Sequence, residues 1–168
     1  LSHSSAASDV YKRQRNNWKL EEVLELFNKP FNELLFEAHD THIQNHKKDM
    51  VQVCTLLSIK TGGCPEDCGY CSQSIHSDDP IEATPLMSLD EVKKQATLAR
   101  DQGSTRFCMG AAWRRPSNKN IDRVIKMIDV VHDLGMESCV TLGMLSEDQA
   151  VRLSKSCLLY TSPSPRDY

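Results

Sequence analysis

The first third of the chain carries apolar residues at helical spacing. From residue 18 onward they fall three and four positions apart, which places them on one side of a helix, and Pro30 ends that helix because proline cannot continue it. A second helix begins at Phe31, and we expect it to have a buried side of its own. The apolar positions are Leu20, Val23, Leu24 and Phe27 in the first helix and Leu34, Leu35, Ala38 and Ile43 in the second.

Strand and helix patterns alternate in the remainder of the chain. Residues 51–59 are so rich in apolar residues that they indicate a strand buried on both faces in a parallel sheet. Further strands are expected at 105–109 and 137–142, and a helical stripe of isoleucine and valine runs from 121 to 131. This order predicts an α/β fold of repeated βα units with right-handed crossovers.

Local signals indicate where the later helices begin and end. Ser88 and Ser146 each open a capping box, in which the serine oxygen accepts a hydrogen bond from a first-turn amide while the side chain three residues later reaches back. Gly103 and Gly135 follow helical stretches and are suited to end them. A loop is expected at 76–87. Three βα units result, too few to close a barrel.

The charge balance excludes some classes of partner. The 168 residues include 20 Lys and Arg and 23 Asp and Glu, interspersed to a net charge of −3, so no basic stripe is present to bind nucleic-acid phosphates. No apolar run approaches the roughly 20 residues that cross a bilayer, and the N-terminus lacks the apolar segment of a signal peptide. We therefore expect a cytoplasmic protein without nucleic-acid or membrane partners.

Three of the seven cysteines stand close together after the first strand, as Cys64-x3-Cys68-x2-Cys71. Without a secretion signal, cysteines indicate reduced thiols or metal ligands, and soft thiolates select iron–sulfur clusters, zinc or Cu(I). A structural zinc site needs a fourth ligand, and no second pair of cysteines or histidines supplies it. The spacing favours a metal centre with one open position for chemistry, and a zinc-stabilised interaction module is the alternative.

The other candidate ligands lie in regular elements. Cys108 and Cys139 fall in the second and third strands, where their side chains could meet inside a barrel; two buried core cysteines are the alternative. Cys54, in the first strand, is interpreted as a small core residue without a role. Three histidines, His39, His42 and His46, follow one another at helical spacing, and we interpret them as a solvated helix face rather than a metal site.

The cysteine loop resembles that of the radical S-adenosylmethionine enzymes, which have the same spacing. Longer segments narrow the resemblance to the biotin synthase family: TLLSIKTGG at 55–63, PED at 65–67 and QS at 73–74, followed by GSTRFCMGAAW at 103–113 and GMESCVTLG at 135–143. The resemblance implies a (β/α)8 barrel of the TIM type. Residues 15–156 would then be two cap helices and about the first three βα units of its N-terminal part.

The resemblance also implies the ligands of two clusters. Cys64, Cys68 and Cys71 would hold a [4Fe–4S] cluster whose fourth iron binds S-adenosyl-L-methionine. Cys108 and Cys139 would be two ligands of a [2Fe–2S] cluster, with another cysteine and an arginine lying beyond residue 156.

Three further residues match cofactor-binding positions in the family. Tyr70 resembles an aromatic residue near the adenine, with packing under the loop as the alternative, and Ala111 and Trp113 match positions near cofactor and substrate. Glu66 and Asp67 are expected to bond the local backbone, and we assign no general acid or base.

The implied reaction is sulfur insertion into dethiobiotin. Cleavage of S-adenosylmethionine yields a 5′-deoxyadenosyl radical that takes hydrogen from dethiobiotin, and sulfur from the second cluster then closes the ring of biotin. The implied partners are a flavodoxin-type electron donor and a second subunit in a homodimer. The alternative is a related radical S-adenosylmethionine enzyme of the hydrogenase-maturation or iminoacetate-forming type, which need not keep both Cys108 and Cys139.

The two ends of the chain differ from the middle. Residues 1–14 are small and polar, and residues 157–168 switch abruptly to a Pro/Ser tract. Both resemble translated adaptor or vector sequence, so we expect non-native or disordered tails that pack against nothing. We also expect that these 168 residues alone are not a working enzyme, because the barrel and the second cluster site would be incomplete.

Overall fold

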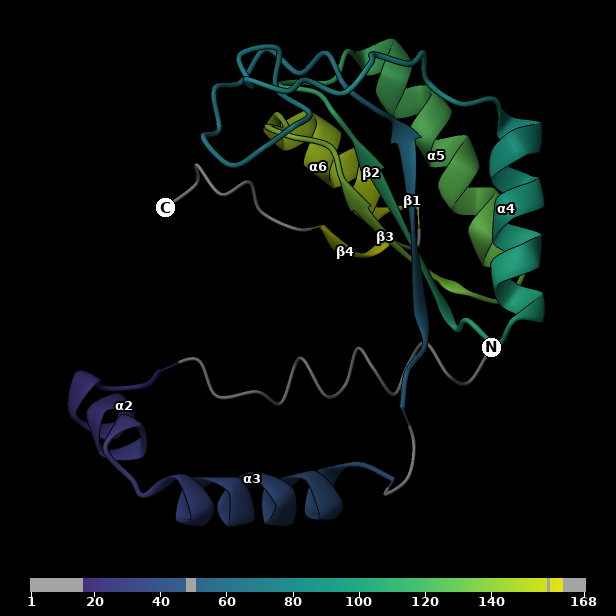
Figure 1. Cartoon of the computed structure of the whole chain (residues 1–168). Coiled ribbons are helices and arrows are strands. Elements are labelled where there is room, and N and C mark those ends of the chain that lie inside the picture. Colours follow the sequence, from purple (N-terminus) through teal and green to yellow (C-terminus); the bar gives the residue numbers. More distant parts are fainter. Residues whose placement is uncertain (1–16, 48–50, 157, 162–168) are drawn as a thin grey trace. The chain divides into compact units, whose positions relative to one another are not determined.

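The computed structural model describes residues 17–47, 51–156 and 158–161 (Figure 1). The chain divides into two compact units, residues 1–51 and 52–168. The elements in order are α2 (Leu20–Phe27), α3 (Phe31–Asn45), β1 (Cys54–Lys60), α4 (Leu89–Asp101), β2 (Arg106–Ala111), α5 (Asn118–Asp133), β3 (Glu137–Thr141), α6 (Glu147–Ser154) and β4 (Leu158–Thr161). None of the helices in these ranges is long and apolar enough to cross a membrane.

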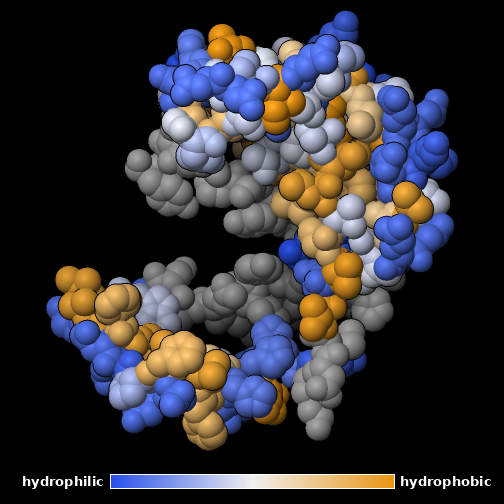
Figure 2. Space-filling view, in the orientation of Figure 1, coloured by the Kyte–Doolittle hydropathy of each residue, from blue (hydrophilic) through white to orange (hydrophobic). Residues whose placement is uncertain are grey.

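The first unit contains the two predicted helices, but their apolar sides are not buried. No residue of α2 or α3 is buried; Phe27 is 82% and Leu35 57% exposed, and apolar side chains lie at the surface along α2 (Figure 2). The prediction that the apolar side of the second helix is buried is therefore wrong. Periodicity gives a helix its apolar side but cannot supply the surface that covers it. The three histidines are exposed, as expected of a solvated face.

The second unit is an α/β layer with a parallel sheet in the order β1-β2-β3-β4. The three predicted strands are confirmed; α4 and α5 connect them as the βα pattern predicts, and α6 follows β3. The fourth strand corrects the expectation that residues 157–168 pack against nothing, because Leu158–Thr161 pairs with β3. An unpaired strand edge offers hydrogen bonds to any β-compatible segment that follows, and a Leu-Leu-Tyr-Thr stretch qualifies. Residues 1–14, 157 and 162–168 lie outside the described residues.

The capping signals act as predicted. The Ser88 Oγ accepts a hydrogen bond from the Glu91 amide at 3.3 Å while the Glu91 carboxylate accepts one from the Ser88 amide at 2.9 Å. The Ser88 hydroxyl also donates to the Glu91 carboxylate at 2.7 Å, and this bond, together with the one from the Ser88 amide, lowers the pKa of Glu91. Ser146 and Gln149 form the second box, and Gly103 and Gly135 take positive φ angles after α4 and α5. Local hydrogen bonding therefore sets these helix ends.

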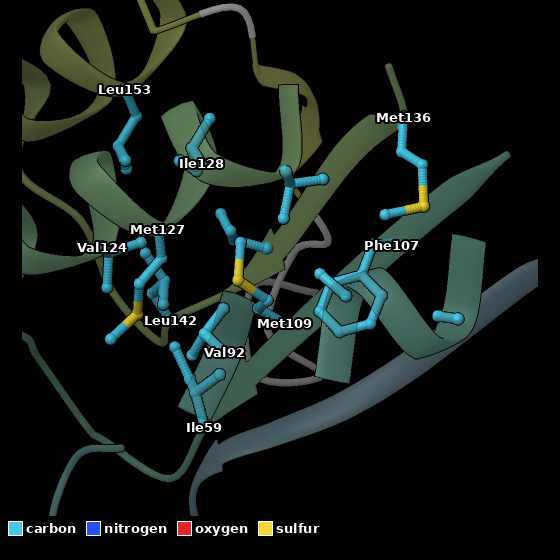
Figure 3. Close-up of a cluster of buried hydrophobic side chains, with 14 of the residues drawn as sticks. Ile59, Val92, Phe107, Met109, Val124, Met127, Ile128, Met136, Leu142 and Leu153 are labelled. Carbon is cyan, nitrogen blue, oxygen red and sulfur yellow. The ribbon is translucent and has the colours of Figure 1, made fainter. Parts of the chain in front are cut away.

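The core lies between the sheet and its helices (Figure 3). Phe107 and Met109 of β2 and Val140 of β3 are fully buried. They pack with Ile59 of β1 and with side chains of all three helices, among them Val92, Ala96, Ile121, Val124, Ile128 and Leu153. The prediction that the first strand is buried on both faces is wrong, since Leu56 is 73% exposed and only Ile59 of β1 is buried. The helices cover one face of the sheet, so burial along β1 alternates.

The other face of the sheet, which we term the second face, carries three rows of side chains in register. The first row is Cys54–Arg106–Glu137, the second Leu56–Cys108–Cys139 and the third Ser58–Gly110–Thr141. In the first row, the guanidinium of Arg106 and the carboxylate of Glu137 form a half-buried ion pair of 2.9 Å. Parallel pairing thus places Cys108 and Cys139 side by side on one face.

Candidate metal centre

The loop that holds Cys64, Cys68 and Cys71 begins where β1 ends, and we term residues 61–75 the cysteine loop. Its two ends are tied together, because the Cys64 amide donates to the Gln73 carbonyl and the Ile75 amide donates to the Cys64 carbonyl, both at 2.9 Å. A tight turn joins the other two cysteines through a 2.9 Å bond from the Cys71 amide to the Cys68 carbonyl. One folded loop therefore presents all three thiols, each half-buried.

The donor set suits an iron–sulfur cluster in its chemistry. Three soft thiols in one loop, with no fourth cysteine in that loop, match a cluster that leaves one iron open. Within the described ranges no three His, Cys, Asp or Glu side chains already stand in the arrangement that holds a metal ion. Three thiolates repel one another, so we expect a bound metal cation to draw their sulfur atoms together.

Gly62 allows a second segment to lie against the start of the cysteine loop. Its φ is +66°, and a Cβ built there would stand 2.5 Å from the Ile81 carbonyl oxygen and 2.7 Å from that of Glu82. Two hydrogen bonds of 2.9 Å hold residues 81–84 against the cysteine loop, one from the Thr84 amide to the Thr61 carbonyl and one from the Ile81 amide to the Ser72 carbonyl. Only a residue without a side chain fits this backbone and this space.

We expect Gly62→Ala to destabilise the protein by about 2–4 kcal/mol. This is the sum of the cost of holding alanine in a left-handed backbone conformation and the cost of the steric overlap between its Cβ and the backbone of residues 81–82. The matched control is Gly103→Ala, because Gly103 has a φ of +93° but open space around its Cβ position. That control should lose only about 1–2 kcal/mol. Urea unfolding of both variants measures the difference, and equal losses would show that the overlap with residues 81–82 has no cost.

Lys60 joins the ends of β1 and β2. Its ammonium group donates to the Ala112 carbonyl at 2.9 Å and also to the Gly62 carbonyl at the start of the cysteine loop. Burial lowers the pKa of Lys60. The side chain thus fixes the first turn of the cysteine loop to the second strand.

Two further loops meet the cysteine loop at the carboxyl edge of the sheet. Arg114, just after β2, forms a 2.7 Å ion pair with the carboxylate of Glu66. The Met144 amide donates to the Arg114 carbonyl at 2.9 Å, and Gly143 lies so close to the Trp113 carbonyl that a Cβ would stand 2.3 Å from it. No local pattern in the sequence predicts these contacts, because the residues that form them lie 30 or more positions apart.

A second group of thiols lies on the second face. Cys108 and Cys139 are register partners, and the Cys54 sulfur lies 3.2 Å from the Cys108 sulfur. Partial desolvation, with the Cys108 hydrogen bond, raises the pKa of Cys54 to about 11, and desolvation also raises the pKa of Cys108. Cys54 is exposed, so its interpretation as a core residue is wrong.

The predicted cofactor-binding residues lie at the same edge as the cysteine loop. Tyr70 is 75% exposed, so the alternative of packing under the loop is wrong. Ala111 ends β2 opposite Lys60, and Trp113 packs partly against the core.

The two groups of thiols are separated by a row of small side chains. Leu56, in the row of Cys108 and Cys139, is four residues before Lys60, which at ~3.3 Å per residue is about 13 Å along the strand. Ser58, Gly110 and Thr141 lie between, and a Cβ at Gly110 would meet nothing within 4 Å. The second face therefore has space between the loop and the second thiol row.

Comparison with known proteins gives one consistent result, although no family model matches the chain. It is 53% identical over 146 residues to a protein of Novosphingobium aromaticivorans, 56% over 148 residues to one of Vesicomyosocius okutanii and 50% over 160 residues to one of Thioalkalivibrio sulfidiphilus. All three are named biotin synthase. The matches cover 87%, 88% and 95% of this chain but 41%, 46% and 46% of the relatives. The chain is thus homologous to less than half the length of the curated relatives it matches.

Proposed function

We propose that the chain is part of a biotin synthase, an enzyme that converts dethiobiotin to biotin. The observation that carries this proposal is the agreement between the curated relatives and the two groups of thiols, one in the loop after β1 and one on the second face. We also propose that the four parallel strands belong to a (β/α)8 barrel whose interior is the second face, which accounts for an apolar Leu56 left exposed on it.

The proposal gives each group of thiols a cluster to hold. Cys64, Cys68 and Cys71 would bind a [4Fe–4S] cluster, and Cys108 and Cys139 would contribute to a [2Fe–2S] cluster. When bound, such clusters supply one electron to S-adenosyl-L-methionine and sulfur to the product.

The residues around the proposed clusters hold the cysteine loop in place and line the space beside it. Lys60 and the Glu66–Arg114 ion pair hold the cysteine loop on the edge of the sheet. Tyr70, Ala111 and Trp113 would line the S-adenosylmethionine site, and the space above Gly110 would take dethiobiotin. A flavodoxin-type electron donor and a homodimer are further parts of the proposal that rest on the family resemblance alone.

A chimera tests this function directly. Residues 17–156 would replace the homologous segment of the Novosphingobium aromaticivorans relative, and the purified chimera would be reconstituted anaerobically with iron and sulfide. We expect formation of biotin from dethiobiotin and S-adenosylmethionine. A chimera that holds iron and sulfide without making biotin would contradict the proposed activity and favour a related radical enzyme. A preparation that binds stoichiometric zinc and no cluster would support the interaction module instead.

We expect Gly110→Leu in this chimera to leave folding and iron content unchanged but to reduce biotin formation at least tenfold. A leucine fits the open space at this strand position, so the sheet is not strained, but its side chain occupies the gap between the two groups of thiols. Gly110→Ala is the matched control and should retain most of the activity. Unchanged turnover in the leucine variant would place the substrate elsewhere.

A further inference from the structure

Among the cysteines that the structure describes, the proposed function leaves one without a role. Cys54 is exposed at the start of β1, and its sulfur lies 3.2 Å from that of Cys108 on the neighbouring strand. A disulfide requires about 2.05 Å between sulfur atoms, so an approach of roughly 1.2 Å would close the bond.

Cys54 pairs in register with Arg106, so Cys54 and Cys108 are diagonal neighbours and closing the bond requires the end of the strand to move. Cys54 is the first residue of β1, and β1 is the outermost strand of the sheet in the described part of the chain. Cys108, by contrast, lies in β2 between two paired strands. A small shift of the strand end, with rotation of the Cys54 side chain, would close the gap while the core around Phe107 and Met109 stays in place.

We propose that Cys54 and Cys108 form a reversible disulfide across β1 and β2, a modification site that controls whether Cys108 is free to bind metal. With glutathione disulfide as oxidant, the exposed Cys54 thiol first loses its proton to solvent, and the resulting thiolate attacks the disulfide and releases one glutathione as its thiolate. The Cys108 thiolate then attacks the Cys54 sulfur and releases the second. The protein gains one S–S bond and loses two electrons and two protons, which the two glutathione thiols take up.

The disulfide is proposed from the approach of the two sulfur atoms, whereas its effect on cluster binding rests on the proposed function. Cys108 bonded to Cys54 cannot serve as a metal ligand, because the ligand is the free thiolate. Oxidation would therefore prevent Cys108 from binding metal until a thiol reductant breaks the disulfide.

Peptide mapping of the full chain tests the disulfide. Trypsin separates the cysteines of interest into peptides 49–60, with Cys54, 107–114, with Cys108, and 127–152, with Cys139. The chain is treated with glutathione disulfide, free thiols are alkylated, and the digest is analysed by mass spectrometry. We expect peptides 49–60 and 107–114 to be linked, and the link to disappear with dithiothreitol.

Two variants make the result specific. Cys54→Ser should abolish the link and return Cys108 to alkylation, whereas Cys139→Ser should keep the link. A bond between Cys108 and Cys139, or a glutathione adduct that stays on Cys54, would overturn the proposal.

The consequence for metal is measured separately in the chimera. Iron and sulfide content after anaerobic reconstitution, without prior reduction, should be lower in the oxidised protein than in oxidised Cys54→Ser. If the disulfide forms but the iron and sulfide contents of the two proteins are equal, the disulfide is confirmed and the assignment of Cys108 as a cluster ligand is wrong.

Discussion

Replacing Cys68 by alanine should abolish cleavage of S-adenosyl-L-methionine in the chimera and reduce its iron content by the share of one cluster. The cysteine loop offers three thiols and no fourth cysteine, so loss of one leaves two ligands for a cluster that needs three. Methionine release and iron per chain are the measurements. Cys64→Ala and Cys71→Ala should behave in the same way.

The matched control is Cys54→Ala, a cysteine outside the loop. It should retain cleavage, because Cys54 lies at the opposite end of β1 from the cysteine loop. Normal cleavage by the Cys68 variant would remove this residue from the ligand set.

Replacing Phe107 by alanine should destabilise the chain by about 3–5 kcal/mol, a large share of the ~5–15 kcal/mol that typically separates folded from unfolded states. Phe107 is fully buried where β2 meets the helices (Figure 3), and its ring leaves a cavity that the surrounding side chains fill only in part. Urea unfolding followed by circular dichroism measures the change, which should appear in the midpoint with little change in slope.

Ser138→Ala is the matched control, because Ser138 is the register partner of Phe107 on β3 and is equally buried. Its hydroxyl oxygen has no hydrogen-bond partner among the residues that the structure describes. Removing an unsatisfied buried group should be neutral or slightly stabilising. A similar loss of stability in both variants would mean that any substitution in β2 or β3 lowers the free energy of unfolding, and that the cavity is not the cause.

The sequence by itself determined the features that depend on neighbours along the chain. The capping boxes at Ser88 and Ser146, the helix-ending glycines and the order of strands and helices all follow from hydrogen bonds and periodicity within a few residues. The spacing of Cys64, Cys68 and Cys71 belongs to the same class, since one loop holds all three. These predictions needed no knowledge of what packs against what.

Only the tertiary structure decided which faces are covered and which distant residues meet. The exposure of Leu56, the Glu66–Arg114 ion pair and the contact of Cys54 with Cys108 join positions that strand pairing and loop packing bring together. Amphipathic periodicity likewise gave α2 and α3 an apolar side without a surface to bury it. Each of these outcomes depends on the register between strands and on where the helices lie. The pattern of residues along the chain specifies neither the register nor the helix positions, because side-chain contacts across a sheet join residues about 50 positions apart.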